Sequence, residues 1–252
     1  MRKLFIIGIG AGNPDYVTVQ AINALNKVDV FFIPDKGSEK DGLNRLRTDI
    51  CERFITQKNY RFAHVKRPQR AATSDYKADV DDWHARIEAD YQRLLAEELG
   101  EDECGAFLVW GDPALYDSTL RIVERIAAKG TVAFDYELIP GISAVQALAA
   151  QHRVALNRIG EPVMITTGRK LAEGFPDNAG SAVVMLDGEQ AFKKVAAADL
   201  EIFWGAYVGT QDEVLVSGPL SEVKDEIEKT RAELRAQNGW IMDIYLLRTP
   251  EK

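Results

Sequence analysis

The sequence predicts an α/β protein of two domains, with a mostly parallel sheet in the first and a mixed sheet in the second. Two observations support this prediction. Apolar runs that resemble strands alternate with helical patterns as far as Arg153, which is typical of a parallel sheet. Beyond that residue, strands outnumber helices, which favours a mixed sheet. We place the domains at 1–158 and 159–252, and each is long enough to bury a core of its own.

Four strands are predicted in the first half, at KLFIIGI, DVFFI, GAFLVW and TVAFDYELI. GAFLVW is continuously apolar, as a parallel strand buried on both faces requires. The helices are TVQAINALNKV, LNRLRTDICERF, TLRIVERIAAKG, AVQALAAQ and a long acidic helix. The acidic helix is indicated by apolar residues at helical spacing, namely Val80, Trp83, Ile87, Tyr91, Leu94 and Leu95. Gly130 suits the end of the helix that precedes it.

The second half contains four predicted strands, PVMITTG, SAVVML, EIFWGAY and WIMDIYLL. Two helices lie between them, the short EQAFKKVAA and the long SEVKDEIEKTRAELRAQ. The long helix is predicted to begin at Ser221 and to end near Gly239, a common pattern of helix capping.

Composition narrows the class of protein. The 252 residues are 46% hydrophobic and 28% charged, with a net charge of −8, which is ordinary for a soluble globular protein and counts against a nucleic-acid partner. Two cysteines cannot form a disulfide scaffold, so we expect a reduced cytoplasmic protein. No apolar run is long enough for a membrane span. The three histidines are scattered without the spacing of metal ligands, so no metal is expected.

Charge is unevenly distributed along the chain. Ten Lys and Arg against four Asp and Glu lie between Lys36 and Arg70, and three against eleven lie between Asp75 and Glu103. The acidic run fits the solvated face of a helix. The basic run contains Pro68 and polar residues typical of loops. It is either a solvated surface or a segment that presents Arg67 and Arg70 to an anionic ligand.

Three loops that follow predicted strands contain the unusual residues: GIGAGNP, WGDPALYDST and PGISA. In parallel sheets such loops meet beyond the carboxyl ends of the strands, so we expect them to converge on one site. Taken singly, each pattern is also typical of an ordinary turn. The first loop departs from the dinucleotide fingerprint GxGxxG because Asn13 and Pro14 follow its glycines.

At these residues the sequence resembles the tetrapyrrole (corrin and porphyrin) methylase family. The family motifs GxGPGDP, GDPxxYGS and PGIS correspond to GIGAGNP, GDPALYDS and PGISA, with departures at Ala11, Asn13 and Asp117. VVMLDG and WGAYVGTQDE extend the similarity over nearly the whole chain. The resemblance implies the two-domain fold of the class III methyltransferases, an active site in the cleft between the domains, S-adenosylmethionine as cofactor, a tetrapyrrole substrate and a homodimer.

The resemblance also implies which residues contact the cofactor, many of them through the backbone. Asp112 is the exception, because its carboxylate suits the sulfonium or amino group of the cofactor; its alternative role is an Asp-turn that holds Pro113. The implied cofactor-binding residues are Ala11, Trp110, Gly111, Asp112, Leu115, Ser143, Ala144, Leu186 and Gly209.

Substrate-binding residues are expected in the basic run and near the start of the second half, and catalytic residues are expected on loops that line the cleft. The carboxylates of a tetrapyrrole need local positive charge, for which we select Arg67, Arg70, Arg158 and Arg169. Methyl transfer itself requires mainly that the cofactor and the substrate are aligned in a cleft that excludes water. For a step that needs a base or a hydrogen-bond donor, Asp35 is our first choice because it directly follows the second strand, and Tyr116 is the alternative.

Three other functions are weighed. A methylase of the same fold acting on another acceptor remains open. A nicotinamide-dependent dehydrogenase would find a ribose partner in Asp35, but Asn13 and Pro14 break its phosphate loop. A binding module without catalysis would keep the fold and lack turnover.

Overall fold

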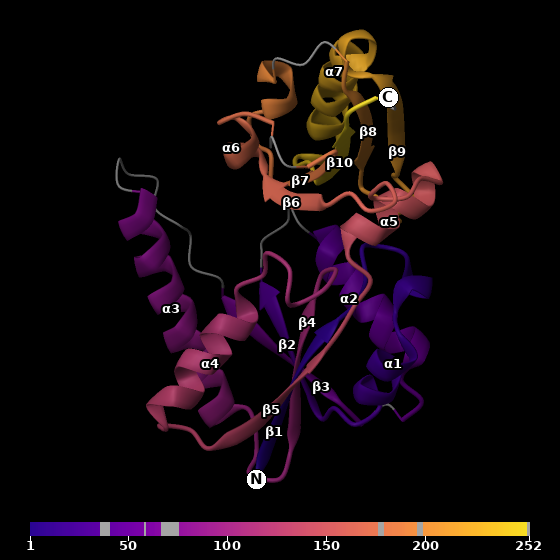
Figure 1. Ribbon diagram of the computed structural model, residues 1–252. Helices are drawn as coiled ribbons and strands as arrows, with labels where there is room; N and C mark the ends of the chain where they lie inside the picture. Colours follow the sequence, from indigo (N-terminus) through magenta and orange to yellow (C-terminus); the bar gives the residue numbers. More distant parts are fainter. Residues whose placement is uncertain (36–40, 58, 67–75, 176–178, 196–198, 251–252) are drawn as a thin grey trace. The chain divides into compact units, whose positions relative to one another are not determined.

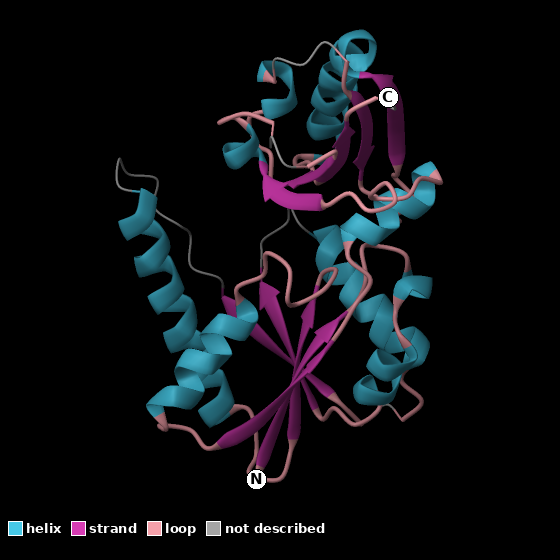
Figure 2. Ribbon diagram, in the orientation of Figure 1, coloured by secondary structure: helices cyan, strands magenta, loops and turns pink. Residues whose placement is uncertain are grey.

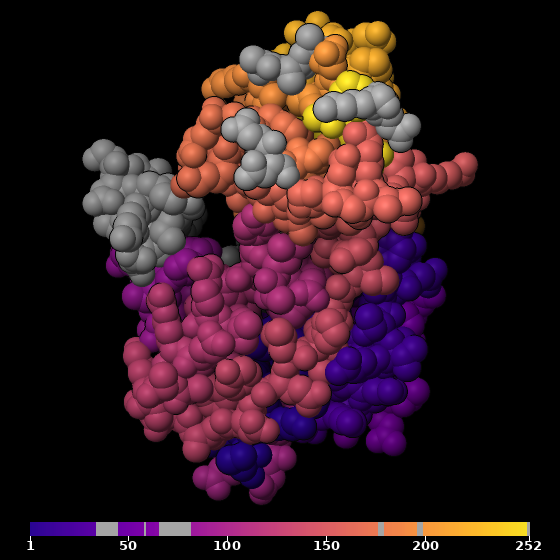
Figure 3. Space-filling view, in the orientation of Figure 1, coloured from indigo at the N-terminus to yellow at the C-terminus, as the bar shows by residue number. Residues whose placement is uncertain are grey.

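Two five-stranded sheets organise the chain, one in the unit Met1–Ser143 and the other in the unit Ala144–Lys252. The computed structural model describes residues 1–35, 41–57, 59–66, 76–175, 179–195 and 199–250; the remaining residues are grey in Figures 1 and 3. Among the described residues, no helix combines the length and the apolar character needed to cross a membrane.

The first sheet is parallel throughout and has the strand order β3-β2-β4-β1-β5. Its strands are β1 (Arg2–Gly8), β2 (Val30–Asp35), β3 (Arg61–Lys66), β4 (Cys104–Val109) and β5 (Phe134–Ile139). The helices of this unit are α1 (Val19–Leu25), α2 (Asp41–Phe54), α3 (Tyr76–Glu97) and α4 (Thr119–Lys129), with a 3₁₀ turn η1 (Pro14–Tyr16) after β1.

Helices cover both faces of this sheet, so its central strands are buried on both sides (Figure 2). Every residue of β4 is buried. In β1, Phe5 and Ile7 pack into the core formed with α1 and α2, whereas Leu4 and Ile6 pack into the core formed with α3 and α4. The alternation of side chains along a strand therefore supplies two cores from one apolar run.

The second sheet is mixed and has the order β6-β7-β10-β8-β9, in which only the β6–β7 pair is parallel. Its strands are β6 (Val163–Thr167), β7 (Ser181–Met185), β8 (Glu201–Ala206), β9 (Val214–Pro219) and β10 (Asp243–Arg248). The helices are α5 (Ala144–His152), α6 (Gly168–Leu171) and α7 (Leu220–Asn238), with a 3₁₀ turn η3 (Ala191–Lys194). The strands and α-helices are labelled in Figure 1.

The predicted fold class, a parallel sheet followed by a mixed sheet, is confirmed. Two strands were missed, β3 and β9, and both are edge strands. The chain divides after Ser143, whereas the predicted boundary followed Arg158. Helix α5 contacts β8 and β10, so it belongs with the second unit.

The second unit also departs locally from the predicted elements. In the described part of EQAFKKVAA, Ala191–Lys194 form the 3₁₀ turn η3, and the predicted strand PVMITTG ends at Thr167 because Gly168 begins α6. Helix α7 begins at Leu220, so Ser221 lies inside it and makes no cap. Its predicted end is confirmed: Gly239 terminates the helix with a φ of 72°.

An ion pair fastens the start of β3 to the segment that precedes β4. The two oxygens of Glu103 each accept a hydrogen bond from the Arg61 guanidinium at 2.7 Å, and the N–H of Gly100 donates to the same carboxylate at 2.8 Å. The hydrogen bond from Arg61 is the main cause that lowers the pKa of Glu103 to about 2, from an ordinary value of 4.5.

We predict that Glu103→Gln lowers the free energy of unfolding by about 1 kcal/mol at neutral pH, since the pair is partly exposed. Because the folded-state pKa is depressed, the unfolded state binds the proton first, and the wild-type advantage should shrink as the pH falls from 4.5 toward 2. Urea unfolding across this range measures the difference. Glu101→Gln, an exposed change in the same loop, is the control; a wild-type advantage that grows on acidification would contradict the prediction.

Candidate functional site

Three loops begin side by side at the carboxyl edge of the first sheet. In the parallel register Gly8 lies opposite Val109 of β4, and Ile7 lies opposite Ile139 of β5. The strands β1, β4 and β5 therefore end at the same level. The three loops that the sequence singled out follow directly, so the predicted convergence is found within this unit.

The first and second loops are joined through their backbones. Gly10 donates its N–H to the carbonyl of Gly111 at 3.3 Å, and Gly111 donates to the carbonyl of Gly10 at 2.8 Å. Both residues have a positive φ, 82° and 70°, which glycine adopts without steric cost. The first glycine-rich loop is thus bound to the loop that carries WGDPALYDST.

The third loop packs against both of the others, backbone to backbone. A Cβ built on Gly8 would lie 2.6 Å from the backbone nitrogen of Gly141, and a Cβ on Gly141 would lie 2.1 Å from the carbonyl oxygen of Gly111. Side chains do not fit at these distances. Glycine is required here because three stretches of backbone occupy the space that one Cβ would need.

Asp112 joins the second loop to the third through its carboxylate. Its Oδ1 accepts the N–H of Ala114 at 2.8 Å, which forms the predicted Asp-turn, and its Oδ2 accepts the N–H of Gly141 at 2.9 Å. Each oxygen therefore has a backbone donor. The turn at Pro113 and the position of the third loop both depend on this side chain.

The other predicted residues of this unit differ in exposure. Ala11 and Ser143 are buried, and Trp110 and Leu115 are half-buried. Tyr116 is 46% exposed and has a φ of 51°, which is rare for a bulky residue. Non-glycine residues in this region concentrate at binding and catalytic sites, so Tyr116 gains weight as a candidate.

The path after the first loop does not form a pyrophosphate site. Helix α1 begins only at Val19, after the turn η1, and the Thr18 hydroxyl already accepts the N–H of Ala21 at 3.1 Å. Asn13 in turn accepts the N–H of Asp15 at 2.9 Å. Dinucleotide enzymes instead direct free N–H groups of a helix at the phosphates. This geometry disfavours the dehydrogenase alternative.

In the second unit, β7 and β8 are both antiparallel to β10 and therefore run in the same direction. Leu186 follows β7 with a φ of 54° and is 67% exposed. Tyr207 follows β8 with a φ of 49° and leads to Gly209. Two residues in the left-handed region thus stand at one edge of this sheet, at or next to predicted cofactor positions. Ala144, the third predicted residue of this unit, begins α5.

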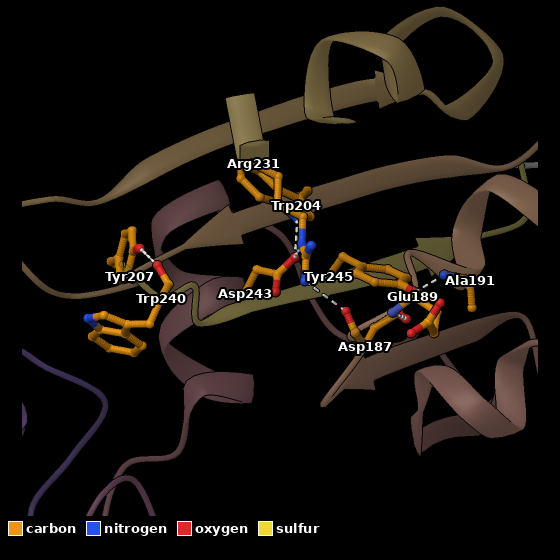
Figure 4. Close-up of polar contacts among 9 residues, drawn as sticks. All are labelled: Asp187, Glu189, Ala191, Trp204, Tyr207, Arg231, Trp240, Asp243 and Tyr245. Atoms are coloured by element: carbon orange, nitrogen blue, oxygen red, sulfur yellow. Dashed lines mark hydrogen bonds and ion pairs between the residues drawn. The ribbon is translucent and has the colours of Figure 1, made fainter. Parts of the chain in front are cut away.

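A network of buried polar side chains lies next to this edge of the second sheet (Figure 4). Arg231 of α7 donates from Nε to Asp243 Oδ2 at 2.8 Å, and Trp204 Nε1 donates to the same oxygen at 3.1 Å. The side chains of this ion pair are 6% and 7% exposed. Burial raises the pKa of Asp243, while the charge of Arg231 opposes that rise.

Asp187, directly after Leu186, connects to the same network. Its Oδ2 accepts the hydroxyl of Tyr245 at 2.6 Å and the N–H of Ala191 at 2.7 Å. Its backbone oxygen accepts Nη2 of Arg231 at 3.1 Å. Burial raises the pKa of Tyr245, so its hydroxyl stays protonated and acts as a donor. The sequence pattern did not single out Asp187, Arg231 or Tyr245; the one available signal was the motif VVMLDG, which contains Asp187.

The predicted substrate and catalytic residues have different positions in the structure. Arg67 and Arg70 lie outside the described residues. The guanidinium of Arg158 donates to the backbone oxygen and the hydroxyl of Thr249, which is a structural contact, whereas Arg169 is exposed at the start of α6. Asp35 is the last residue of β2, at the carboxyl edge of the first sheet; its side chain lies outside the described part.

Comparison with known proteins identifies similar chains. Residues 3–224 match the family model of the tetrapyrrole (corrin/porphyrin) methylases. The chain is 59% identical over 249 residues to a precorrin-6A synthase (deacetylating) from Sinorhizobium, an alignment that covers 98% of this chain and 95% of the relative. The structure aligns with that of CobF from Corynebacterium diphtheriae, described as related to cobalamin synthesis, with a TM-score of 0.86, 38% identity and full coverage of both chains. A uroporphyrin-III C-methyltransferase from Thermus thermophilus, solved with S-adenosyl homocysteine, shares the fold at a TM-score of 0.60 and 16% identity, over 98% of this chain and 97% of the other.

We predict that Asp112→Asn lowers the free energy of unfolding by about 1–3 kcal/mol, because an amide can accept only one of the two backbone N–H groups and leaves the other unsatisfied. Asp117→Asn is the matched control in the same loop. There a single oxygen accepts the N–H of Thr119 at 2.7 Å, which an amide oxygen can also do. Urea unfolding compares the two variants, and equal stability would contradict the role of Asp112.

Proposed function

This chain belongs to the tetrapyrrole (corrin/porphyrin) methylase family, and we propose that it is an S-adenosylmethionine-dependent C-methyltransferase of cobalamin biosynthesis. The proposed reaction methylates ring carbon 1 of precorrin-5 and releases acetate, which gives precorrin-6A. The observation that carries this proposal is the high identity, along nearly the whole chain, to a precorrin-6A synthase (deacetylating).

The described loops fit S-adenosylmethionine better than a dinucleotide. The first loop, from Gly8 to Val17, contains no Lys or Arg, and the next helix already has a capping side chain at Thr18. Such a loop offers backbone groups and room, which suit a sulfonium cation. We propose that the cofactor is held by the residues Ala11, Trp110, Gly111, Asp112, Leu115 and Ser143 of the first unit and Ala144, Leu186 and Gly209 of the second.

When bound, the cofactor supplies a methyl group on a positively charged sulfur. The residues of the chain then have to orient the two reactants and exclude water. Well-oriented groups gain roughly 7–11 kcal/mol over free encounter at best, and the closely packed loops around Gly8 and Gly141 provide the rigid backbone that such orientation needs. Because the cofactor supplies the reactive group and the protein supplies orientation, backbone contacts can serve in methyl transfer where other enzymes use acid and base side chains.

Recognition of the macrocycle requires positive charge on the protein. Arg169 is exposed at the start of α6 and is a candidate to bind a substrate carboxylate, and Arg67 and Arg70 remain candidates from the basic run. Arg158 is also a candidate, although its guanidinium already donates to the hydroxyl and the backbone oxygen of Thr249.

Release of acetate needs chemistry that methyl transfer does not provide. Water attacks the carbonyl carbon of the acetyl group, the bond from that carbon to the macrocycle breaks, and the electron pair returns to the macrocycle. A base that accepts the proton of water assists this step by about 10²–10⁴-fold. We propose Asp35 as this base, with Tyr116 as the alternative donor to the acetyl oxygen.

The proposed function is tested by turnover. The protein is incubated with precorrin-5 and S-adenosylmethionine carrying a labelled methyl group, and mass spectrometry follows the macrocycle and the acetate. We expect one labelled methyl group per macrocycle together with one acetate. Methylation of another tetrapyrrole in preference to precorrin-5 would favour the remaining alternative, a methylase with a different acceptor. From the family resemblance we also propose a homodimer located in the cytoplasm.

We predict that Ser143→Trp weakens S-adenosylmethionine binding at least tenfold, because the indole fills the space beside the third loop. Calorimetry with the cofactor alone measures the affinity, and circular dichroism verifies the fold. The control is Thr131→Trp, which places the same side chain at an exposed residue before β5, where the strands begin rather than end. This variant should bind S-adenosylmethionine as tightly as the wild type does. Unchanged affinity in a folded Ser143→Trp protein would remove this loop from the cofactor site.

We predict that Asp35→Asn binds the cofactor normally but releases acetate at least a hundredfold more slowly, because an amide cannot accept the proton from water. A methylated macrocycle that retains its acetyl group should accumulate, or turnover should stop before methylation. Mass spectrometry distinguishes these products. Acetate release at the wild-type rate would exclude Asp35 and make Tyr116 the candidate, for which Tyr116→Phe is the corresponding variant.

A further inference from the structure

We propose that Tyr245 is a positioning residue for the cofactor site, which acts through Asp187 to hold Leu186 in its left-handed conformation. The inference rests on the proposed function because it takes Leu186 as a cofactor contact. Tyr245 itself is 1% exposed and lies within the sheet, so its effect on a ligand is transmitted through the protein (Figure 4).

The loop after β7 has a backbone that its sequence does not favour. Leu186 has a φ of 54° and Gln190 a φ of 56°, although neither is glycine. For side chains of this size the left-handed region is strained and persists only where surrounding contacts enforce it. The exposed side chain of Leu186 depends on this conformation, since the backbone sets its direction. Something outside the loop must therefore stabilise it.

Asp187 is the residue through which the loop is held. Two of its hydrogen bonds come from within the segment, from the N–H groups of Glu189 at 3.2 Å and Ala191 at 2.7 Å. These bonds shape the loop but move with it. Two others come from elements that belong to the rest of the unit, and only these can fix the loop relative to the sheet.

The two external anchors are Tyr245 and Arg231. Tyr245 lies opposite Val184 in the β7–β10 register, two residues before Leu186, and its hydroxyl reaches Asp187 Oδ2 at 2.6 Å. Arg231 reaches the backbone oxygen of Asp187 and is itself held by Asp243. Of these two, Tyr245 is the one that can be altered with less disturbance, because removal of Arg231 would leave the buried carboxylate of Asp243 without its cationic partner.

A second contact restricts Asp187 from another side. Gly168, the first residue of α6, approaches so closely that a Cβ there would lie 2.3 Å from Cγ and from Oδ1 of Asp187. Alanine at this position would push Asp187 without removing any hydrogen-bonding group. Two independent substitutions can therefore displace the same carboxylate.

The first test measures S-adenosylmethionine affinity by calorimetry for the full chain and for Tyr245→Phe. This variant keeps the ring and loses only the hydroxyl, so we expect it to fold, with a melting temperature a few degrees lower, and to bind the cofactor about tenfold more weakly. Ile227→Val is the control: it removes one buried methyl group from α7 and should lower the melting temperature similarly with unchanged affinity.

The second test compares Gly168→Ala with Gly188→Ala. A Cβ at Gly188 meets nothing within 4 Å among the described residues, so this variant adds the same methyl group to the loop after β7, next to Asp187, without a collision. Gly168→Ala should weaken cofactor binding, and Gly188→Ala should not. Since Tyr245 and Gly168 both act through Asp187, the double variant Tyr245→Phe, Gly168→Ala should lose less affinity than the product of the single losses.

Steady-state kinetics with precorrin-5 distinguishes a positioning role from a loss of stability, because lower stability alone would not change the KM for only one of the two reactants. The KM for S-adenosylmethionine should rise in Tyr245→Phe and Gly168→Ala, while the KM for precorrin-5 stays within twofold of the wild type. Unchanged cofactor affinity in both variants would overturn the positioning role and leave the proposed function intact. Conversely, cofactor binding without conversion of precorrin-5 by the wild type would overturn the proposed function, and the affinity measurements would still decide the role of Tyr245.

Discussion

The contact among Gly8, Gly111 and Gly141 is the constraint on which the first unit depends. Three loops from three strands meet so closely that no Cβ fits at Gly8 or Gly141, so their backbones form one rigid edge. The parallel register brings β1, β4 and β5 to the same level, and the reciprocal bonds between Gly10 and Gly111 lock the first two loops together. A site made in this way presents peptide groups in fixed positions. Such groups suit a reaction in which alignment, rather than proton transfer, limits the rate.

The second unit reaches a similar result through different interactions. Its corresponding edge contains Leu186 and Tyr207, which hold left-handed conformations without being glycine. Buried polar contacts enforce the first of these, through Asp187, and hydrogen bonds to the backbone of Trp240 and Met242 hold Tyr207. Buried charges are costly unless they are paired, and here each has hydrogen-bond partners. In one unit small residues shape the loops, and in the other a polar network does so.

The fold class could be predicted from the sequence, but one edge strand of each sheet could not. Continuous apolar runs such as GAFLVW identify central strands because both faces are buried. Edge strands have less to bury: in β3 only Ala63 and Val65 are buried among the described side chains, and no residue of β9 is buried. The position of α5 was also beyond prediction, because an apolar helix does not reveal which sheet it will contact. The role of Tyr245 was missed for a related reason, because a tyrosine in an apolar strand is usually interpreted as a core residue. Its contact with Asp187 joins residues that are distant in the sequence.

Two of the three departures from the family motifs, at Asn13 and Asp117, have physical explanations. Asn13 stands where the family often has aspartate, and its side chain accepts the N–H of Asp15 in the turn after the first loop. Asp117 replaces glycine and accepts the N–H of Thr119, which caps α4, whereas Ser118 makes no side-chain cap. Ala11, in place of proline, is buried. At Asn13 and Asp117 the new side chain is bonded to its own segment, so the loop backbones can serve the same purpose. The family relationship therefore survives at backbone positions that side-chain identity alone would have obscured, whereas the roles proposed for Asp35 and Tyr116 depend on side chains that the shared backbone does not dictate.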